Sequence, residues 1–257
     1  MSALAPKILV YDVETTPIQA YVWGMYDTNV IEVIEPSHHL CFAYRWLNSG
    51  EPVKVVSQRQ FGRGYKRNKR DDKQLMTALW KLHDEADIVI AHNGNSFDQK
   101  KANARFLVNG LPKPSPYLQI DTMRIARKEF KLESNKLDDL GKVLGLGRKI
   151  ATGGFSTWTG CMAGDGDSWD LMEKYNIVDV ELLEDVYIRL RDGGWITNHP
   201  NLALMAQDRH ACPKCGSHDM MKRGPRYTAT AVKQTYQCMS CNSYSSERTM
   251  KTGPRYA

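Results

Sequence analysis

Two carboxylates follow the first apolar segment of the chain with a spacing that suits metal chemistry. Residues 7–13 (KILVYDV) are apolar and rich in β-branched side chains, and they predict a buried strand. Because side chains alternate along a strand, Asp12 and Glu14 would share one face. Two such carboxylates repel each other unless a cation lies between them or one is protonated. Ordinary charge at the end of a strand gives the same pattern, so the pair alone does not decide the chemistry.

Two further motifs place acids where a folded chain would present them to a cleft. Asp98 follows the apolar segment 87–93 and a polar turn, and it opens a segment with helical character. Tyr175 and Asp179 stand four residues apart in a predicted helix and therefore project from the same face. Each has a plain alternative, because a helix N-terminus favours an acid through its dipole and a half-buried tyrosine can hydrogen-bond a neighbour. Catalysis requires that the fold bring these groups to the first carboxylate pair.

Four cysteines near the C-terminal end form two CxxC pairs. Cys212 pairs with Cys215 and Cys238 with Cys241, and 22 residues separate the pairs. Two-residue spacing lets both sulfurs of one turn reach one ion, and two such turns supply the tetrahedral sulfur shell that Zn²⁺ prefers. Gly216 suits the positive φ that such a turn requires. The pattern predicts one structural zinc site, with two disulfides or two redox-active pairs as the alternatives.

Basic side chains are concentrated in two segments. Residues 206–257 carry nine Lys and Arg against three Asp and Glu, which leaves 26 of each sign in residues 1–205. Residues 59–70 add six basic side chains and no acid, with aromatic residues between them. Cations meet phosphates and rings stack on bases, so both segments suggest contact with nucleic acid, although a solvated loop is the alternative for residues 59–70. The residues predicted to contact nucleic acid are Arg59, Arg63, Tyr65, Lys66, Arg67, Asn95, Lys222, Arg223 and Arg226.

Apolar periodicity outlines the elements that must position these groups. Strands are expected over residues 7–13, 40–46 and 52–57, which can form a meander, and over 87–93 and 116–122. Helices are expected over residues 72–86, 97–108, 123–130, 136–144 and 168–192, whereas the Gly- and Ser-rich residues 152–168 predict a long loop. Strands first, then strands alternating with helices, favour an α/β fold in which helices flank a mixed sheet.

Length and composition indicate the number of domains and the class of protein. The chain of 257 residues, at about 150 residues per domain, suits one medium core and a small second domain, and the composition changes near residue 205. No apolar run approaches the roughly 20 residues of a membrane span, and the N-terminus does not have the pattern of a signal peptide. We therefore expect a cytoplasmic protein with reduced thiols and no membrane partner. The absence of a GxxxxGK[ST] motif argues against ATP-driven activity.

In their order and context, the acidic motifs resemble those of the DEDD superfamily of 3′–5′ exonucleases, in its tyrosine-bearing (DEDDy) branch. The matching segments are YDVETTP with Asp12 and Glu14, AHNGNSFD with Asp98, and YNIVD with Tyr175 and Asp179. The resemblance covers roughly residues 7–190 and is nearest to stand-alone relatives of the proofreading domain of family B DNA polymerases. It implies a ribonuclease H-like mixed sheet flanked by helices over residues 1–205, and residues 206–257 resemble a zinc ribbon.

The resemblance also implies a mechanism of two-metal hydrolysis. Two Mg²⁺ or Mn²⁺ ions would neutralise the charge that develops on a phosphodiester. Asp12 would bridge both ions, Glu14 and Asp179 would complete the first site, and Asp98 would support the second. Tyr175 would orient the attacking water, because a phenol with a pKa near 10 favours hydrogen bonding over proton removal at neutral pH.

The expected function is a 3′–5′ exonuclease that removes nucleoside monophosphates from single-stranded DNA 3′ ends. The alternatives are a ribonuclease of the same mechanism, a catalytically inactive nucleic-acid-binding module, and an endonuclease acting on branched or flapped DNA. A zinc ribbon suggests a further partner, either nucleic acid or a replication or repair protein. The combination of domains suggests a phage or mobile-element replication accessory that acts in the host cytoplasm.

Overall fold

The computed structural model describes residues 5–26, 28–147, 150–229 and 231–249. The chain divides into two compact units, one of residues 7–186 and one that contains the chain from Tyr187 onward. This division falls inside the long helix α7 (Gly166–Asp192), whereas the composition changes near residue 205. Of the predicted domain 206–257, residues 250–257 lie outside the described part.

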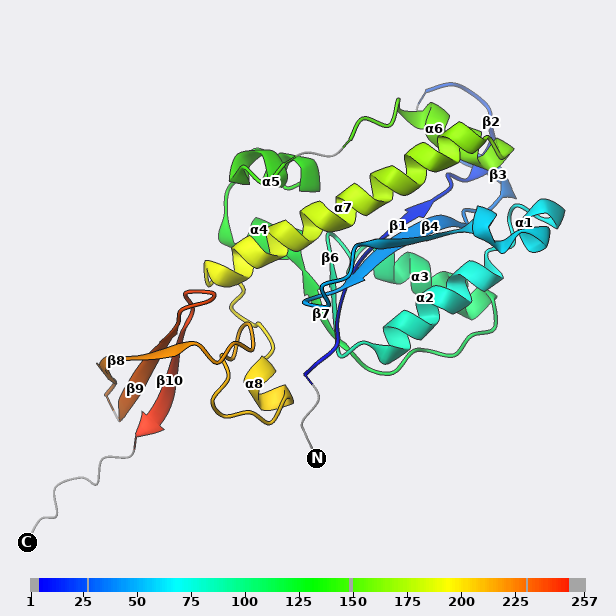
Figure 1. Cartoon of the computed structure of the whole chain (residues 1–257). Coiled ribbons are helices and arrows are strands. Elements are labelled where there is room, and N and C mark those ends of the chain that lie inside the picture. The colour runs from blue at the N-terminus through cyan, green and yellow to red at the C-terminus, as the bar shows by residue number, and fades with distance from the viewer. Residues whose placement is uncertain (1–4, 27, 148–149, 230, 250–257) are drawn as a thin grey trace, which may run out of the picture. The chain divides into compact units, whose positions relative to one another are not determined.

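A five-stranded mixed sheet forms the centre of the first unit (Figure 1). Its strands, in spatial order, are β5 (Lys54–Ser57), β4 (His39–Trp46), β1 (Ile8–Thr15), β6 (Ile88–Ala91) and β7 (Leu118–Asp121). The predicted meander is confirmed, because β4 pairs antiparallel with both β1 and β5. On the other side of β1, the strands β6 and β7 run parallel to it. The carboxyl ends of β1, β6 and β7 therefore lie at the same edge of the sheet.

Helices cover both faces of this sheet. Figure 1 shows α7 crossing one face, with α2 (Lys73–Glu85) and α3 (Asp98–Val108) on the other. Leu9, Tyr11 and Val13 of β1 join the buried cluster that α2 and α3 complete. Strand alternation then directs Asp12 to the opposite face, towards α7. Burial of apolar side chains contributes roughly 1.5–3 kcal/mol each, so this layer holds β1 in place without any help from a metal.

The segment predicted as a long loop, residues 152–168, is mostly helical, and that prediction was wrong. Helix α6 (Phe155–Ala163) and the first turn of α7 occupy it. Cys161 of α6 packs with Trp169 of α7 in one buried cluster on the sheet. This tertiary burial overrides the weak helix propensity of the Gly- and Ser-rich sequence. Helices α4 (Thr122–Glu129) and α5 (Leu137–Leu144) lie within a residue or two of their predicted positions.

Two further departures from the sequence expectations lie around the sheet. Residues 59–70 do not form a plain loop, because they contain the end of the 3-10 helix η1 (Gln58–Phe61) and the short helix α1 (Arg63–Arg67). Between β1 and β4 the chain forms an antiparallel hairpin of β2 (Gln19–Val22) and β3 (Val30–Glu35), which the sequence analysis did not predict. This hairpin is a separate two-stranded sheet.

The second unit contains a short helix and a small antiparallel sheet. These elements are α8 (Leu202–Met205), β8 (Met220–Tyr227), β9 (Val232–Cys238) and β10 (Tyr244–Thr249), with the strands in the order β10-β9-β8. The 22 residues between the two CxxC pairs suit a hairpin, which β8 and β9 form, whereas the polar strand β10 was not anticipated. Within the described ranges, every helix is too short or too polar to pass through a lipid bilayer.

Candidate active site and zinc centre

The carboxylates of Asp12, Glu14 and Asp179 converge where β1 faces α7. One oxygen from each residue lies within 4.8 Å of the others. Asp12 and Glu14 come from the same face of β1, and Asp179 comes from α7, where only 1% of its surface is exposed. Three acids in so small a volume repel one another unless positive charge is present. Oxygen donors of this kind are the ligands that Mg²⁺ and Mn²⁺ prefer, so the donor set fits a divalent cation.

Asn176 fixes the orientation of Asp12 and was not singled out by the sequence analysis. Its Nδ2 donates to Asp12 Oδ2 over 2.8 Å, and its Oδ1 lies 3.6 Å from Cys41 Sγ on β4. Asn176 is fully buried between α7 and the sheet. A buried amide that bonds a carboxylate limits the rotamers available to that carboxylate. The signal in the sequence was the position of this residue, directly after Tyr175 in the YNIVD motif.

Asp98 lies beside β1, at the first turn of α3. It is buried, and its Oδ1 accepts a hydrogen bond from the backbone amide of Val13 over 3.3 Å. This contact places Asp98 against the β1 residue next to Asp12, beyond the point where β6 stops pairing with β1. Asp98 is outside the group of three carboxylates that converge most closely. Its predicted role at a second metal stays a prediction.

The loop between β6 and α3 is shaped by Asp121 at the end of β7. Asp121 accepts from the backbone amides of Asn93, Asn95 and Arg124 at 3.0–3.1 Å. Gly94 has no room for a side chain, because an added Cβ would lie 2.5 Å from Ala91 Cβ. Through these hydrogen bonds, Asp121 holds the backbone of the loop that leads to α3. The side chain of Asn95, predicted to contact nucleic acid, is half-buried in this loop.

Tyr175 lies one helical turn before Asp179 and is half-buried. The indole ring of Trp158 on α6 packs edge-on against the Tyr175 ring, with ring centroids 6.1 Å apart and an interplanar angle of 69°. The contact restricts the tyrosine ring and so defines where its hydroxyl lies. Trp158 falls within the segment predicted as a loop, so the sequence analysis missed this support.

The basic segment 59–70 contains two kinds of side chain. Arg59 has a structural role. Its guanidinium forms a bidentate ion pair with Glu173 of α7, at 2.6 and 2.8 Å, and also contacts Asp170. The Tyr65 hydroxyl accepts from Trp169 Nε1 over 2.9 Å and is likewise an internal contact. Arg63, Lys66 and Arg67 are exposed and form no ion pair within the described ranges. Of these five predicted contact residues, three are exposed cations and two form internal contacts.

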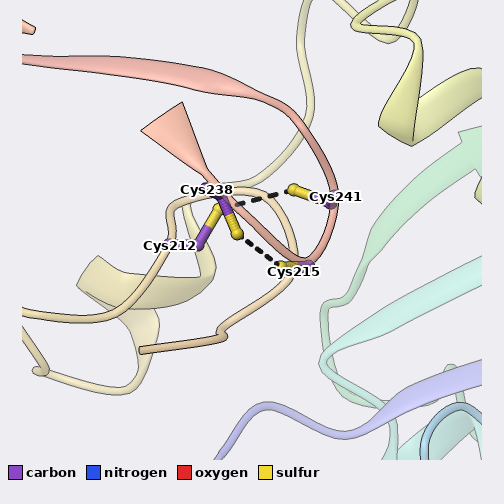
Figure 2. A group of neighbouring side chains, drawn as sticks. All are labelled: Cys212, Cys215, Cys238 and Cys241. Carbon is purple, nitrogen blue, oxygen red and sulfur yellow. Dashed lines mark hydrogen bonds between the residues drawn. The ribbon is translucent and has the colours of Figure 1, made fainter. Parts of the chain in front are cut away.

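The four cysteines of the second unit form a compact sulfur cluster (Figure 2). All four sulfurs lie within 4.8 Å of one another, with Cys212 and Cys241 3.7 Å apart and Cys215 and Cys238 3.6 Å apart. A disulfide bond is about 2.05 Å long, so none is formed. Four sulfurs bound to Zn²⁺ at about 2.3 Å in a tetrahedron stand about 3.8 Å apart, close to what is observed. The cluster therefore has the dimensions of a zinc site.

The turns that carry the cysteines have the backbone geometry of metal-binding knuckles. Gly216 and Asn242, each directly after the second cysteine of its pair, have φ of 78° and 57°. Hydrogen bonds from Ser243 and from backbone amides outweigh burial and lower the pKa of Cys212 to about 7, whereas burial raises the pKa values of Cys215 and Cys241. A thiol with a lowered pKa is readily converted to the thiolate that binds metal.

The predicted contact residues Lys222, Arg223 and Arg226 are all exposed along β8.

Comparison with known proteins gives a family match and a similar solved structure for the chain. A family described as the RNase_H superfamily matches residues 49–191, a range that includes Asp98, Tyr175 and Asp179 and begins after β1. No curated protein sequence shows significant similarity to the chain. The structure of the family B DNA polymerase from the hyperthermophilic archaeon Pyrobaculum calidifontis is similar, with a TM-score of 0.52 and 14% identity. The similarity covers 88% of this chain but only 31% of the polymerase, and it shows a shared fold.

Proposed function

The chain belongs to the RNase H superfamily, and from this premise we propose that it is a metal-dependent 3′–5′ exonuclease acting on single-stranded DNA. The observation that carries the proposal is the convergence of Asp12, Glu14 and Asp179 within 4.8 Å at the end of β1. Asp98 stands beside the same strand. A binding protein has little reason to hold so many acids together, whereas phosphodiester hydrolysis requires the cations that they attract.

Each acid has a proposed place in the metal site. Asp12, Glu14 and Asp179 would hold one divalent ion, and Asp12 with Asp98 would hold a second. Two Mg²⁺ or Mn²⁺ ions bound there would supply the positive charge that phosphodiester hydrolysis requires and would activate a water molecule. Asn176 keeps Asp12 in one orientation, and the Tyr175 hydroxyl, held by Trp158, orients the attacking water.

Two observations bear on the direction of cleavage and on the substrate. The order of the three acidic motifs and the shared fold with a family B DNA polymerase support attack from a DNA 3′ end. The exposed cations Arg63, Lys66 and Arg67, with Asn95 in the loop before α3, would contact the strand. A ribonuclease of the same mechanism would use the same residues, so the sugar has to be tested.

We assign the second unit a structural and binding role. Its four cysteines would hold one Zn²⁺, and Lys222, Arg223 and Arg226 would contact nucleic acid along β8. A replication or repair protein is the alternative partner for this surface. We retain a functional boundary near residue 205, before the first CxxC pair. Four sulfurs without a disulfide are consistent with a reducing, cytoplasmic setting.

The decisive experiment follows the products from labelled oligonucleotides. Single-stranded DNA and RNA of one sequence, labelled at the 5′ end or internally, are incubated with the full chain and Mg²⁺ or Mn²⁺. We expect a ladder that shortens from the 3′ end of DNA and releases nucleoside monophosphates. Asp12→Asn should abolish the ladder, while Glu181→Gln, an exposed acid on α7, serves as the matched control and should behave as wild type.

The other outcomes each overturn a stated part of the proposal. Equal or faster cleavage of RNA would make the protein a ribonuclease, because the 2′-hydroxyl is the local difference between the substrates. Internal cuts without a ladder would make it an endonuclease. Unchanged substrate, together with no binding of Mg²⁺ or Mn²⁺ by calorimetry, would leave a nucleic-acid-binding module.

A further inference from the structure

The β2–β3 hairpin, residues 18–35, exposes an unusual amount of apolar surface. Trp23, Met25 and Tyr26 at its tip are 90%, 88% and 83% exposed. Tyr21 and Ile34, on its two strands, are also at least half exposed. A two-stranded hairpin alone is marginally stable in water, and contiguous exposed apolar surface marks a binding site more often than chance. The hairpin therefore has the character of a surface that meets a ligand.

The hairpin follows β1, the strand that carries Asp12 and Glu14, almost immediately in the sequence. Ile18 lies four positions after Glu14, which is a reach of at most about 14 Å. The base of the hairpin is pinned there, because the Thr16 amide donates to the His38 carbonyl over 2.9 Å and Ser37 Oγ donates to the Thr16 carbonyl over 2.7 Å. A strand whose 3′ end lies at the carboxylates would therefore have the start of this hairpin within about 14 Å of Glu14.

The base of the hairpin also contacts the basic segment, residues 59–70. Arg70 forms an ion pair with Glu35, the last residue of β3. The exposed cations Arg63, Lys66 and Arg67 on α1 belong to the same segment, a few residues before Arg70. Cations and exposed rings thus come from two elements joined at one point. This combination is the one that binds single strands without regard to sequence, because cations follow the phosphates and rings stack on bases.

The charge of the hairpin itself indicates which part of a strand it touches. Residues 15–37 contain no Lys or Arg, and the exposed Glu32 lies on β3. Such a surface does not attract phosphates, but its rings can stack on bases. We propose that the tip of the β2–β3 hairpin, through Trp23 and Tyr26, stacks on unpaired bases of the nucleic acid strand while α1 holds its phosphates. The inference rests on the proposed function, because that function supplies the strand.

The test separates contact with bases from contact with phosphates. Binding of a 5′-fluorescein single-stranded DNA to the full chain is followed by anisotropy in Ca²⁺, which is expected to support binding without hydrolysis. A second oligonucleotide of the same length carries abasic sites in place of its central bases. The double variant Trp23→Ala, Tyr26→Ala is compared with the triple variant Arg63→Gln, Lys66→Gln, Arg67→Gln, and Leu107→Ala is the control for loss of an exposed apolar side chain on α3.

The two variants are expected to fail in different ways. The hairpin variant should bind the base-bearing strand about 10–100-fold more weakly and the abasic strand as wild type does. The α1 variant should bind both strands more weakly, and the slope of its salt dependence should be shallower by about 0.7 for each phosphate that the variant no longer neutralises. Leu107→Ala should bind both as wild type.

Failure of this inference is distinguishable from failure of the proposed function. If the hairpin variant binds both strands as wild type does, while wild type still degrades DNA from the 3′ end, the stacking role is wrong and the exonuclease stands. If, in addition, sedimentation shows a wild-type dimer that the hairpin variant lacks, the hairpin binds a second copy of the chain instead. If wild type hydrolyses no oligonucleotide, the proposed function falls regardless of the binding result.

Discussion

The carboxylate cluster and the cysteine cluster differ in what brings their ligands together. Asp12 and Asp179 come from a strand and a helix that are far apart in the sequence, and buried apolar layers on both faces of the sheet hold those elements. The four cysteines come from two adjacent turns, and the buried cluster around them consists of the cysteines themselves with Met220. The core therefore builds the first site, whereas the proposed zinc ion would hold the second together.

The two regions should therefore respond differently to removal of the proposed metal ions. A core of buried side chains persists without ions, so the first unit should remain folded and only lose its chemistry. A small sheet with little apolar core depends on the free energy of metal binding for its fold.

Loss of the zinc ligands should have the largest effect, and only on the second unit. Structural zinc contributes on the order of 10 kcal/mol to the folding of small domains, so Cys238→Ser should unfold β8–β10. Hydrogen exchange followed by mass spectrometry should show protection lost in these strands and kept in β1 and β6. Loss of protection in β1 as well would contradict the contrast. Ser240→Ala, between the second pair of cysteines, is the control.

Neutralising one carboxylate should remove the chemistry and spare the fold. Glu14→Gln is expected to lower the rate of DNA hydrolysis by about 10²–10³-fold or more, because charge on the reacting phosphate is left unbalanced. Its melting temperature in Mg²⁺-free buffer should be unchanged or higher, since the substitution relieves repulsion among three acids. A lower melting temperature with undiminished activity would show that Glu14 is structural. Glu181→Gln again serves as the matched control.

The stability of the first unit should depend on pH through its core rather than through a metal. His83 is buried among Tyr11, Phe106 and Tyr117, and burial lowers its pKa from 6.5 to about 4. The unfolded chain therefore binds a proton that the folded chain does not, and stability falls as the pH drops from 6.5 towards 4. His83→Phe should reduce this fall by up to about 3 kcal/mol.

The measurement is urea unfolding at several pH values, with zinc in excess. His38 and His39 also have lowered pKa values because they are buried, so the variant should keep part of the slope. A pH dependence identical to that of wild type would show that His83 does not contribute.

Loss of the Asn176 amide should have the smallest of these effects. Asn176→Ala removes the 2.8 Å hydrogen bond that orients Asp12 and leaves every carboxylate in place. Residues that support metal ligands in this way typically change metal affinity or activity by about 10–100-fold. We expect the Mg²⁺ concentration for half-maximal hydrolysis to rise within that range. A lower rate at saturating Mg²⁺, with unchanged Mg²⁺ dependence, would contradict a role in orienting Asp12.

The parts of the structure that follow short-range rules were predictable from the sequence. The apolar, β-branched segments became β1, β4, β6 and β7, and the amphipathic segment after residue 72 became α2. Alternation in β1 and the four-residue spacing of Tyr175 and Asp179 depend only on strand and helix geometry. The CxxC spacing also carries its own geometry, which explains why the sulfur cluster was foreseen.

The parts that depend on tertiary contacts were not predictable. Helix α6 forms in a Gly- and Ser-rich segment because Cys161 is buried with Trp169, a contact that local propensity does not contain. The β2–β3 hairpin was not predicted because apolar side chains lie on both of its exposed faces. Its sequence therefore shows no alternation of apolar and polar residues. Asn176 was missed because its role becomes visible only when α7 lies across β1.

The roles of the basic residues show the same limit. Charge alone made Arg59 equivalent to Arg63, yet Arg59 pairs with Glu173 and Asp170 of α7, while Arg63 is exposed. The acids that distinguish the two arginines lie far away in the sequence. Counting charges identified the segment, and only the fold separates its structural cations from its exposed ones.

Diffraction from crystals of the full chain grown with Zn²⁺ and Mn²⁺, with anomalous data collected at both absorption edges, would locate both metals. We predict a manganese peak among Asp12, Glu14 and Asp179, and a separate zinc peak at the centre of Cys212, Cys215, Cys238 and Cys241. Carboxylates that point apart with no manganese between them would show that the fold does not assemble a hydrolytic metal site.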